Sequence, residues 1–345
     1  MKPRVLLTGL ICIFLSTSIS AEVVSESRAE RVARNFYYHH SQMRYDAITF
    51  SEIIPVDESG ARVYYIFNLP ASLGYVVVSA EDQGYPILAY STKGKFSTQN
   101  QPPNLQSWMT GYIEQVKSIR ENNLKADQGI KSTWYEYEEG FTSNRSGNRS
   151  IVGPYMDDIL WNQDCYYNDS CPAAVSGPCG NTYAGCVATA ASMLLKYHHH
   201  PHQGTGSYSY FHPTYGTQSA NYGATTYDWG NMPKFDANEN IAQLMYHMGV
   251  AVDMDYSPVE SVASSTMVVN ALETYFGYDP VANYDYKSLY TDPVWEGMLM
   301  GELDAERPLY YRGGAPVGHA FICDGYDDDY SGSGNTWFHF NWGWS

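Results

Sequence analysis

Two residues of this chain have the types and the spacing for nucleophilic catalysis. Cys186 follows a turn of small residues and opens a helix-forming run, Val187 to Ala191. Free N–H groups and the macrodipole at a helix N-terminus favour the anionic form of a thiol, which is its reactive form. His319 follows Gly318 in an apolar run 133 residues further on. An imidazole can take the thiol proton and later protonate a leaving amine, so the pair predicts acyl transfer through a thioester.

Three further residues complete this hypothesis. Asn341 lies 22 residues after His319, near the end of the next expected strand, where its amide would hold the imidazole in one tautomer. Trp342 would shield that hydrogen bond from water. The backbone N–H of Cys186 and the side-chain amide of Gln163 are candidate donors to the oxyanion of the tetrahedral intermediate. Each residue also has a purely structural interpretation: a buried cysteine, a core histidine, or the polar end of a strand.

The start of the chain predicts export. Lys2 and Arg4 precede a nearly apolar run, Val5 to Leu15, and mostly small residues lead to Ala21. The apolar run is too short to span a membrane, so a cleaved signal over 1–21 and a secreted, extracellular protein are expected. The alternative is an uncleaved membrane anchor. No later stretch is long enough to span a membrane either.

Five cysteines remain after this signal, and their odd number leaves at least one thiol unpaired. Cys165, Cys171 and Cys179 lie within 15 residues of one another, so one pair among them is a candidate disulfide. A zinc site from the same three residues is the alternative, although they lack a CxxC spacing. A second candidate metal cluster ends the expected helix: His198, His199, His200 and His202. Histidine is also favoured at a helix C-terminus by the dipole, and we expect no metal and no cofactor.

Charge divides the chain sharply. Residues 1–150 carry 15 basic and 15 acidic side chains, whereas residues 151–345 carry 5 basic and 22 acidic ones. The whole net charge of −17 therefore belongs to the second part. Such a surface repels nucleic acid, so a nucleic-acid partner is not expected.

The patterning predicts two α+β units joined by a linker. In the first unit we expect a helix over 24–39, an antiparallel sheet of strands over 48–54, 63–68, 75–79 and 87–90, and a helix over 104–123. A polar segment near 142–150, with Arg145 and Arg149, is typical of an exposed linker open to proteolysis. In the second unit, helices are expected over 186–197, 239–248, 264–276 and 294–302, and strands over 319–323 and 336–341.

These motifs together resemble the streptopain family of secreted bacterial papain-like cysteine peptidases. The strings that carry the resemblance recur in order along 155–345: GCVATA with LKYHHHP, VDMDY, FGY, PLYY, GHAF and NWGW. The strings YVVVSA and PILAYS, within 75–95, are similar to the prodomain of that family. The order of Cys and His and their separation are also typical of papain-like proteases.

The resemblance implies a zymogen. It implies a signal over 1–21, an inhibitory prodomain over 22–140, an activation linker over 141–150 and a papain-like α+β peptidase domain over 151–345. It assigns Cys186 as nucleophile, His319 as general base and Gln163 to the oxyanion hole. Asn341 and Trp342 match the Asn-Trp pair of the family, and Gly318 lies where the family's backbone contacts substrate. The partners implied are protein or peptide substrates and the chain's own prodomain as an intramolecular inhibitor.

The chain departs from the family pattern in three respects. Extra cysteines lie between Gln163 and Cys186, an acidic insertion follows Gly325, and the glycine-rich loop and strands after the Asn-Trp pair are missing, so a truncated C-terminus is expected. Two alternatives to a secreted cysteine endopeptidase stay open. One is a transglutaminase-type acyl transferase, which would use the same Cys-His pair but pass the acyl group to an amine. The other is a non-catalytic secreted binding protein that uses its aromatic surface.

Overall fold

The computed structural model describes residues 24–99, 101, 103–140, 150–313, 318–329 and 335–344. The predicted signal over 1–21 and nearly all of the predicted linker lie outside the described residues. The described part divides into two compact units, one of residues up to 97 with 112–142, and one of residues 98–111 with 143–345. Residues 98–111, which the sequence places in the prodomain, therefore group with the second unit.

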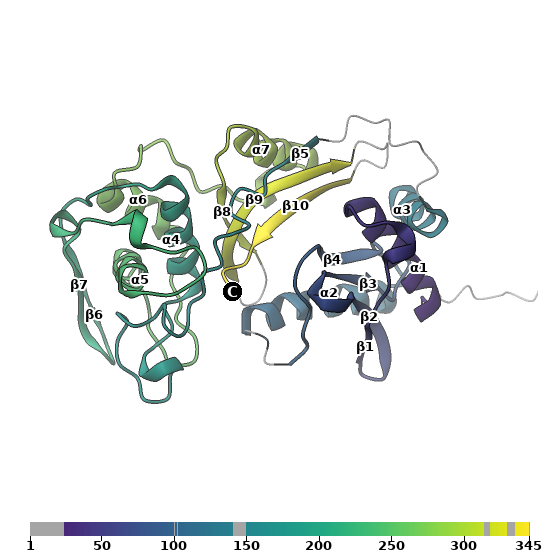
Figure 1. The fold of residues 1–345 in the computed structure, drawn as a ribbon, viewed down its shortest axis with the longest axis horizontal. Helices are drawn as coiled ribbons and strands as arrows, with labels where there is room; N and C mark the ends of the chain where they lie inside the picture. Colours follow the sequence, from purple (N-terminus) through teal and green to yellow (C-terminus); the bar gives the residue numbers. More distant parts are fainter. Residues whose placement is uncertain are drawn as a thin grey trace, which may run out of the picture. The chain divides into compact units, whose positions relative to one another are not determined.

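The first unit is a four-stranded antiparallel sheet covered by helices (Figure 1). The strands pair in chain order and are β1 (Glu52–Glu58), β2 (Ala61–Asn68), β3 (Tyr75–Ser79) and β4 (Ile87–Ser91). Its helices are α1 (Glu26–His40), α3 (Gln128–Glu139) and the part of α2 (Pro103–Glu121) from residue 112 on. The apolar face of α1 packs on β2, β3 and α3, and its core residues Val32 and Phe36 are fully buried.

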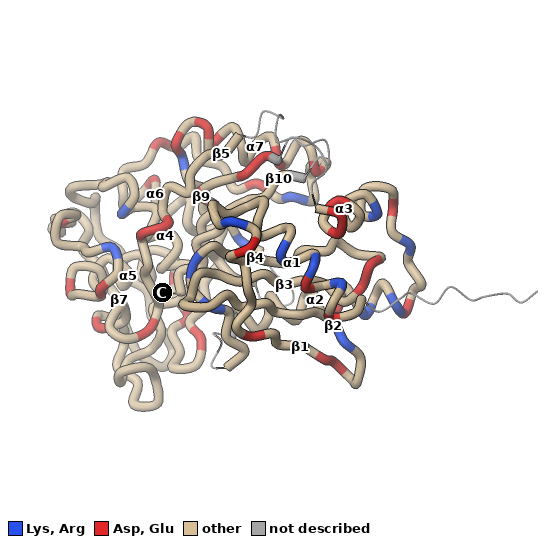
Figure 2. The backbone as a smooth tube through the Cα atoms, turned by 45° about the vertical axis from the view of Figure 1, so that its right-hand side comes forward, with Lys and Arg blue, Asp and Glu red and all other residues tan. Residues whose placement is uncertain are grey.

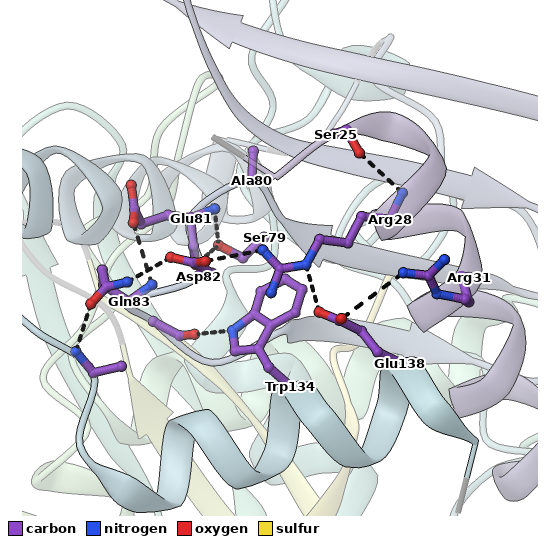
Figure 3. Close-up of polar contacts among 12 residues, drawn as sticks. Ser25, Arg28, Arg31, Ser79, Ala80, Glu81, Asp82, Gln83, Trp134 and Glu138 are labelled. Atoms are coloured by element: carbon purple, nitrogen blue, oxygen red, sulfur yellow. Dashed lines mark hydrogen bonds and ion pairs between the residues drawn. The ribbon is translucent and has the colours of Figure 1, made fainter. Parts of the chain in front are cut away.

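A polar network joins three elements of this unit around Arg28 of α1 (Figure 3). Its Nε donates to Glu138 of α3 at 2.5 Å, and one terminal nitrogen donates to Asp82, in the turn between β3 and β4, at 3.0 Å. The guanidinium also lies 4.8 Å from the ring centroid of Trp134, whose indole N–H donates to the carbonyl of Gly84 at 2.8 Å. This network ties α3, the last helix before the expected linker, to α1 and the sheet.

The second unit pairs a helical part with a second antiparallel sheet (Figure 1). Its strands are β5 (Ser150–Val152), β8 (Leu309–Gly313), β9 (His319–Asp329) and β10 (Asn335–Asn341). The long strand β9 lies between β10 on one edge and β8 and β5 on the other. The helices are α4 (Cys186–His198), α5 (Glu239–Ala251), α6 (Met267–Phe276) and α7 (Asp292–Asp304), and β6 (Tyr208–His212) pairs with β7 (Gly216–Ala220) in a separate hairpin.

Helix α4 is the centre of this unit. Ten consecutive residues, Val187 to Lys196, are buried, because α4 packs on α5 on one side and on β8 and β9 on another. A helix that is apolar almost all round is typical of a core helix. Both units are thus α+β, as the sequence predicts. No helix in the described ranges is long and apolar enough to cross a membrane.

Candidate active site

Cys186 is the first residue of α4, as the sequence predicts. Gly185 before it adopts a positive φ of 91°, a conformation that suits glycine. A methyl group built on Gly185 would meet the side chain of Met254 at 2.8 Å and the carbonyl oxygen of Ser261 at 3.0 Å. Glycine is therefore required there, both for the turn and for the close packing that places the thiol at the helix N-terminus.

The thiol is half-buried, and its pKa is raised above the ordinary value of 9.0. Burial is the main cause, and the nearby carboxylate of Glu260 adds to it. The backbone groups of Ala320, Val187 and Cys186 itself act in the opposite direction and lower the pKa. Burial outweighs them, so in this structure the neutral thiol is the favoured form.

His319 begins β9 and is 3% exposed. Its Nε2 lies 2.9 Å from the carbonyl oxygen of Trp342, so Nε2 carries the proton and Nδ1 is the basic nitrogen. The ring stacks on Trp344 with centroids 4.4 Å apart. Burial lowers the pKa of His319 to about 4, and the Trp342 carbonyl partly opposes this. Both members of the predicted pair are therefore neutral in this state.

The elements that carry the two residues pack on each other. Helix α4, which Cys186 begins, contacts strand β9, which His319 begins. The backbone of Ala320, directly after His319, is among the groups that lower the pKa of Cys186. Sequence reasoning pairs Cys186 with His319 although the two residues are 133 positions apart.

Asn341 has a different place from the one expected. Its amide nitrogen donates to the carbonyl oxygens of Met156 and Ile159, each at 2.8 Å, and its oxygen accepts from the N–H of Gly343 at 3.1 Å. The Nε2 of His319 lies 2.9 Å from the Trp342 carbonyl oxygen, so the role of the Asn341 amide in holding the imidazole stays a prediction. Asn341 instead anchors the turn that presents that carbonyl.

Trp342 and Gln163 both lie by the site. The ring of Trp342 stacks on that of His319 at 6.2 Å and packs on Phe321 at 4.5 Å, which keeps water from the histidine. The carbonyl of Gln163 accepts from the N–H of Ala184 at 2.9 Å, two residues before Cys186. This bond holds the segment of Gln163 beside the turn that delivers the thiol.

Gly318 contacts a residue that sequence reasoning missed. A methyl group built on Gly318 would collide with the guanidinium of Arg312, which shows that the arginine lies directly on the glycine. Only the antiparallel register of β8 and β9 brings these residues together, and no local sequence signal indicates it.

Trp108, in the segment 98–111, packs its ring on the aromatic residues Trp342 and Phe321. Within the second unit its ring lies 5.0 Å from that of Trp342 and 5.7 Å from that of Phe321, both edge-on. The Trp108 ring also packs against Gly313, because a methyl group built on Gly313 would lie 2.8 Å from that ring. Trp108 thus covers the aromatic cluster next to His319.

Most of the other candidate cysteines and histidines are paired or buried. Cys165 and Cys179 form a disulfide, while Cys171 and Cys323 are buried free thiols. The His199 ring stacks on Trp229, and His200 lies 3.3 Å from the carbonyl of Gly277. No group of three or more potential metal ligands occurs among the residues that the structure describes.

A thiol at the start of a helix that packs on an antiparallel sheet, with a histidine at the start of the contacting strand, is typical of papain-like cysteine proteases. Family models match in two places: the Peptidase C10 family over residues 161–345 and the Spi protease inhibitor over residues 21–116. The chain belongs to the Peptidase C10 family, with an inhibitor-type prodomain at its N-terminal side.

Individual relatives agree with this assignment. The chain is 28% identical over 350 residues to the thiol protease/hemagglutinin PrtT of Porphyromonas gingivalis, covering 97% of this chain and 39% of that protein. It is 29% identical over 358 residues to streptopain of Streptococcus pyogenes, covering 90% of this chain and 83% of streptopain. A solved structure of a Prevotella intermedia prointerpain A fragment matches with a TM-score of 0.67 and 28% identity, over 85% of this chain and 88% of that one.

These findings confirm the predicted family, the α+β papain-like class and a cysteine protease made as a zymogen. They also confirm the prodomain as an intramolecular inhibitor.

Proposed function

We propose that this chain is the secreted precursor of a cysteine endopeptidase, with Cys186 as nucleophile and His319 as general base and acid. The observation that supports this most directly is the packing of α4, which Cys186 begins, on β9, which His319 begins. The thiol lies at a helix N-terminus, and the imidazole has a defined tautomer.

The reaction follows from these positions. Nδ1 of His319 takes the thiol proton, and the thiolate attacks the peptide carbonyl carbon to give a tetrahedral intermediate. The N–H of Cys186 and the Gln163 amide donate to its oxyanion. The imidazolium then protonates the leaving amine and the C–N bond breaks. Water attacks the thioester, with His319 again as base, and releases the acid and the free thiol.

Gly318 and the carbonyl of Trp342 have positioning roles in this proposal. The Trp342 carbonyl keeps the proton on Nε2, which leaves Nδ1 free to act as the base. Gly318, directly before His319, presents backbone to the substrate residue next to the scissile bond. The peptidase domain over 151–345 and the prodomain over 22–140 are the segments that we assign to these functions.

The precursor is silent because the thiol and the imidazole are both neutral and because Trp108 covers the aromatic cluster beside His319. Cleavage in the linker over 141–150 would let residues 98–111 leave. Export by the segment over 1–21 would bring the precursor to the proteins that it degrades. Protein or peptide substrates are the partners that this site accepts.

The test compares the intact chain with the chain nicked in 141–150 by an added protease, using a fluorogenic peptide under reducing conditions. We expect hydrolysis only after nicking, and none for nicked Cys186→Ala or His319→Ala. Full hydrolysis by the intact chain would contradict the zymogen. If a supplied amine rather than water receives the acyl group in most turnovers, the product mass identifies an acyl transferase instead.

A further inference from the structure

One positive charge stands out in the acidic second part of the chain. Residues 151–345 contain five basic and 22 acidic residues. Figure 2 marks basic and acidic residues along the backbone. Four of the five basic residues have partners: Lys196 with the carbonyl of Trp229, Lys234 with Asp158, Lys287 with Asp292, and Arg307 with Glu302. For the fifth, Arg312, no carboxylate of the described ranges lies within ion-pair distance, and the side chain is exposed.

The position of Arg312 follows from strand register. Arg312 of β8 pairs with Ala320 of β9, and Gly313 pairs with His319. Side chains at paired positions of antiparallel strands lie on the same face of the sheet. Arg312 therefore shares the face of Ala320, on a pair of strands that both contact α4, the helix that Cys186 begins. Its guanidinium lies directly on Gly318, the residue before the general base.

Both Arg312 and Cys186 influence the pKa of Tyr310. It lies two residues before Arg312 on the same face of β8, and its hydroxyl is 2.8 Å from that of Ser265. Burial raises the pKa of Tyr310; Cys186 adds to this effect and Arg312 opposes it, so both groups lie within electrostatic range of one hydroxyl. Arg312 thus stands within the active-site region, not on a remote surface.

A guanidinium in this position can bind a carboxylate group of a ligand. Its planar fork of donors fits a carboxylate, and charge-assisted hydrogen bonds are stronger than neutral ones. The net negative charge of residues 151–345 disfavours acidic ligands in general. An acidic substrate side chain next to the scissile bond would therefore find one complementary partner here.

We propose that Arg312 is a specificity-determining residue that binds an acidic side chain of the substrate within two residues of the scissile bond. This inference rests on the proposed protease function. It names the substrate class as peptides with Asp or Glu beside the cut.

The test uses peptide pairs that differ only by Glu or Gln, scanned through the two residues on either side of the cut. The full chain is nicked in the linker, and the ratio of kcat/KM for Glu over Gln is measured at each position. At one position we expect this ratio to fall roughly tenfold in Arg312→Gln, since a hydrogen bond to a charged group contributes about that factor. In Arg312→Glu the preference should shift toward Lys at the same position.

Arg307→Gln is the matched control. Arg307 lies just before β8, is exposed and pairs with Glu302 at 2.6 Å, so its loss changes net charge equally without touching the site. We expect its Glu/Gln ratio to equal that of the unaltered chain. Equal ratios in Arg312→Gln and the unaltered chain would overturn the proposal. An equal loss for Glu and Gln peptides in Arg312→Gln would overturn it too, since Arg312 would then only support Gly318.

Binding provides a readout that does not depend on catalysis. The same peptide pairs are titrated into nicked Cys186→Ala, with and without Arg312→Gln, and followed by calorimetry. A Glu preference that disappears with Arg312 supports the proposal even if the protease assignment fails. Equal binding of Glu and Gln peptides to Cys186→Ala contradicts it.

Discussion

The protonation state of Cys186 gives the sharpest prediction about the precursor. In the intact chain the thiol pKa lies above 9.0, so fewer than about one thiol in a hundred is ionised at pH 7. The thiolate is the species that iodoacetamide alkylates. We therefore expect the alkylation rate of Cys186 in the intact chain to be at least about 100-fold below that of a fully ionised thiol.

Nicking in the linker should change both the rate and its pH dependence. When the imidazolium forms beside the sulfur, the thiolate is stabilised and alkylation should proceed well below pH 7. In the intact chain the rate should instead keep rising up to and beyond pH 9, because the pKa of Cys186 is raised by burial.

The assay is quenched alkylation from pH 4 to 10 with peptide mapping by mass spectrometry. Cys171 and Cys323 serve as internal controls, since both are buried free thiols whose pKa is raised by burial. Nicked His319→Ala should keep the slow, alkaline profile of the intact chain. The reasoning is refuted if the intact chain and the nicked chain show the same rate and the same inflection.

Four further perturbations have defined outcomes. Trp108→Ala removes the ring that covers Trp342, so we expect faster Cys186 alkylation and measurable peptide hydrolysis by the intact chain; unchanged rates would exclude this covering role. Arg28→Gln breaks two half-buried ion pairs and should lower the free energy of unfolding of the first unit by about 1–3 kcal/mol in urea, with faster nicking of the linker. Cys165→Ser with Cys179→Ser opens a short loop and should cost about 3 kcal/mol by the same measurement, whereas no change would show that the reduced loop keeps its structure. Burial lowers the pKa of His247 to about 4, so between pH 4 and 6.5 the unfolded chain binds more protons than the folded one. The free energy of unfolding should therefore decrease as the pH falls through that window, by up to about 3 kcal/mol. His247→Gln should flatten this pH dependence, and an unchanged slope would contradict the reasoning.

Much of the fold was predictable because its signals are local. The helix that Cys186 opens, the strand Tyr75–Ser79 and the strand that begins at His319 all appear where apolar periodicity and turn residues place them. The turn before Cys186 is equally local, since Gly185 supplies the positive φ that the chain needs there.

The helices and strands that the sequence did not predict lack such local signals. Helix α3 lies in a polar stretch that resembles a linker, and it depends on packing of Trp134 and on the ion pair of Glu138 with Arg28. The hairpin of β6 and β7 lies in a Tyr- and Ser-rich stretch without a clear alternation. Strand β9 continues through three aspartates, 327 to 329, where a turn was expected, because its neighbours β5 and β10 pair with that end.

By itself the sequence predicted a nucleophile and a base and determined the class of chemistry, because residue type and local conformation set the reactivity of a thiol and an imidazole. Only the tertiary structure decided which group orients His319, which cysteines pair and what lies on Gly318. Each of these depends on contacts between segments distant in the chain: the register of β8 and β9, the path of the turn after β10 and the approach of Cys165 to Cys179. Such contacts arise from packing and strand pairing over the whole unit, and no short stretch of residues encodes them.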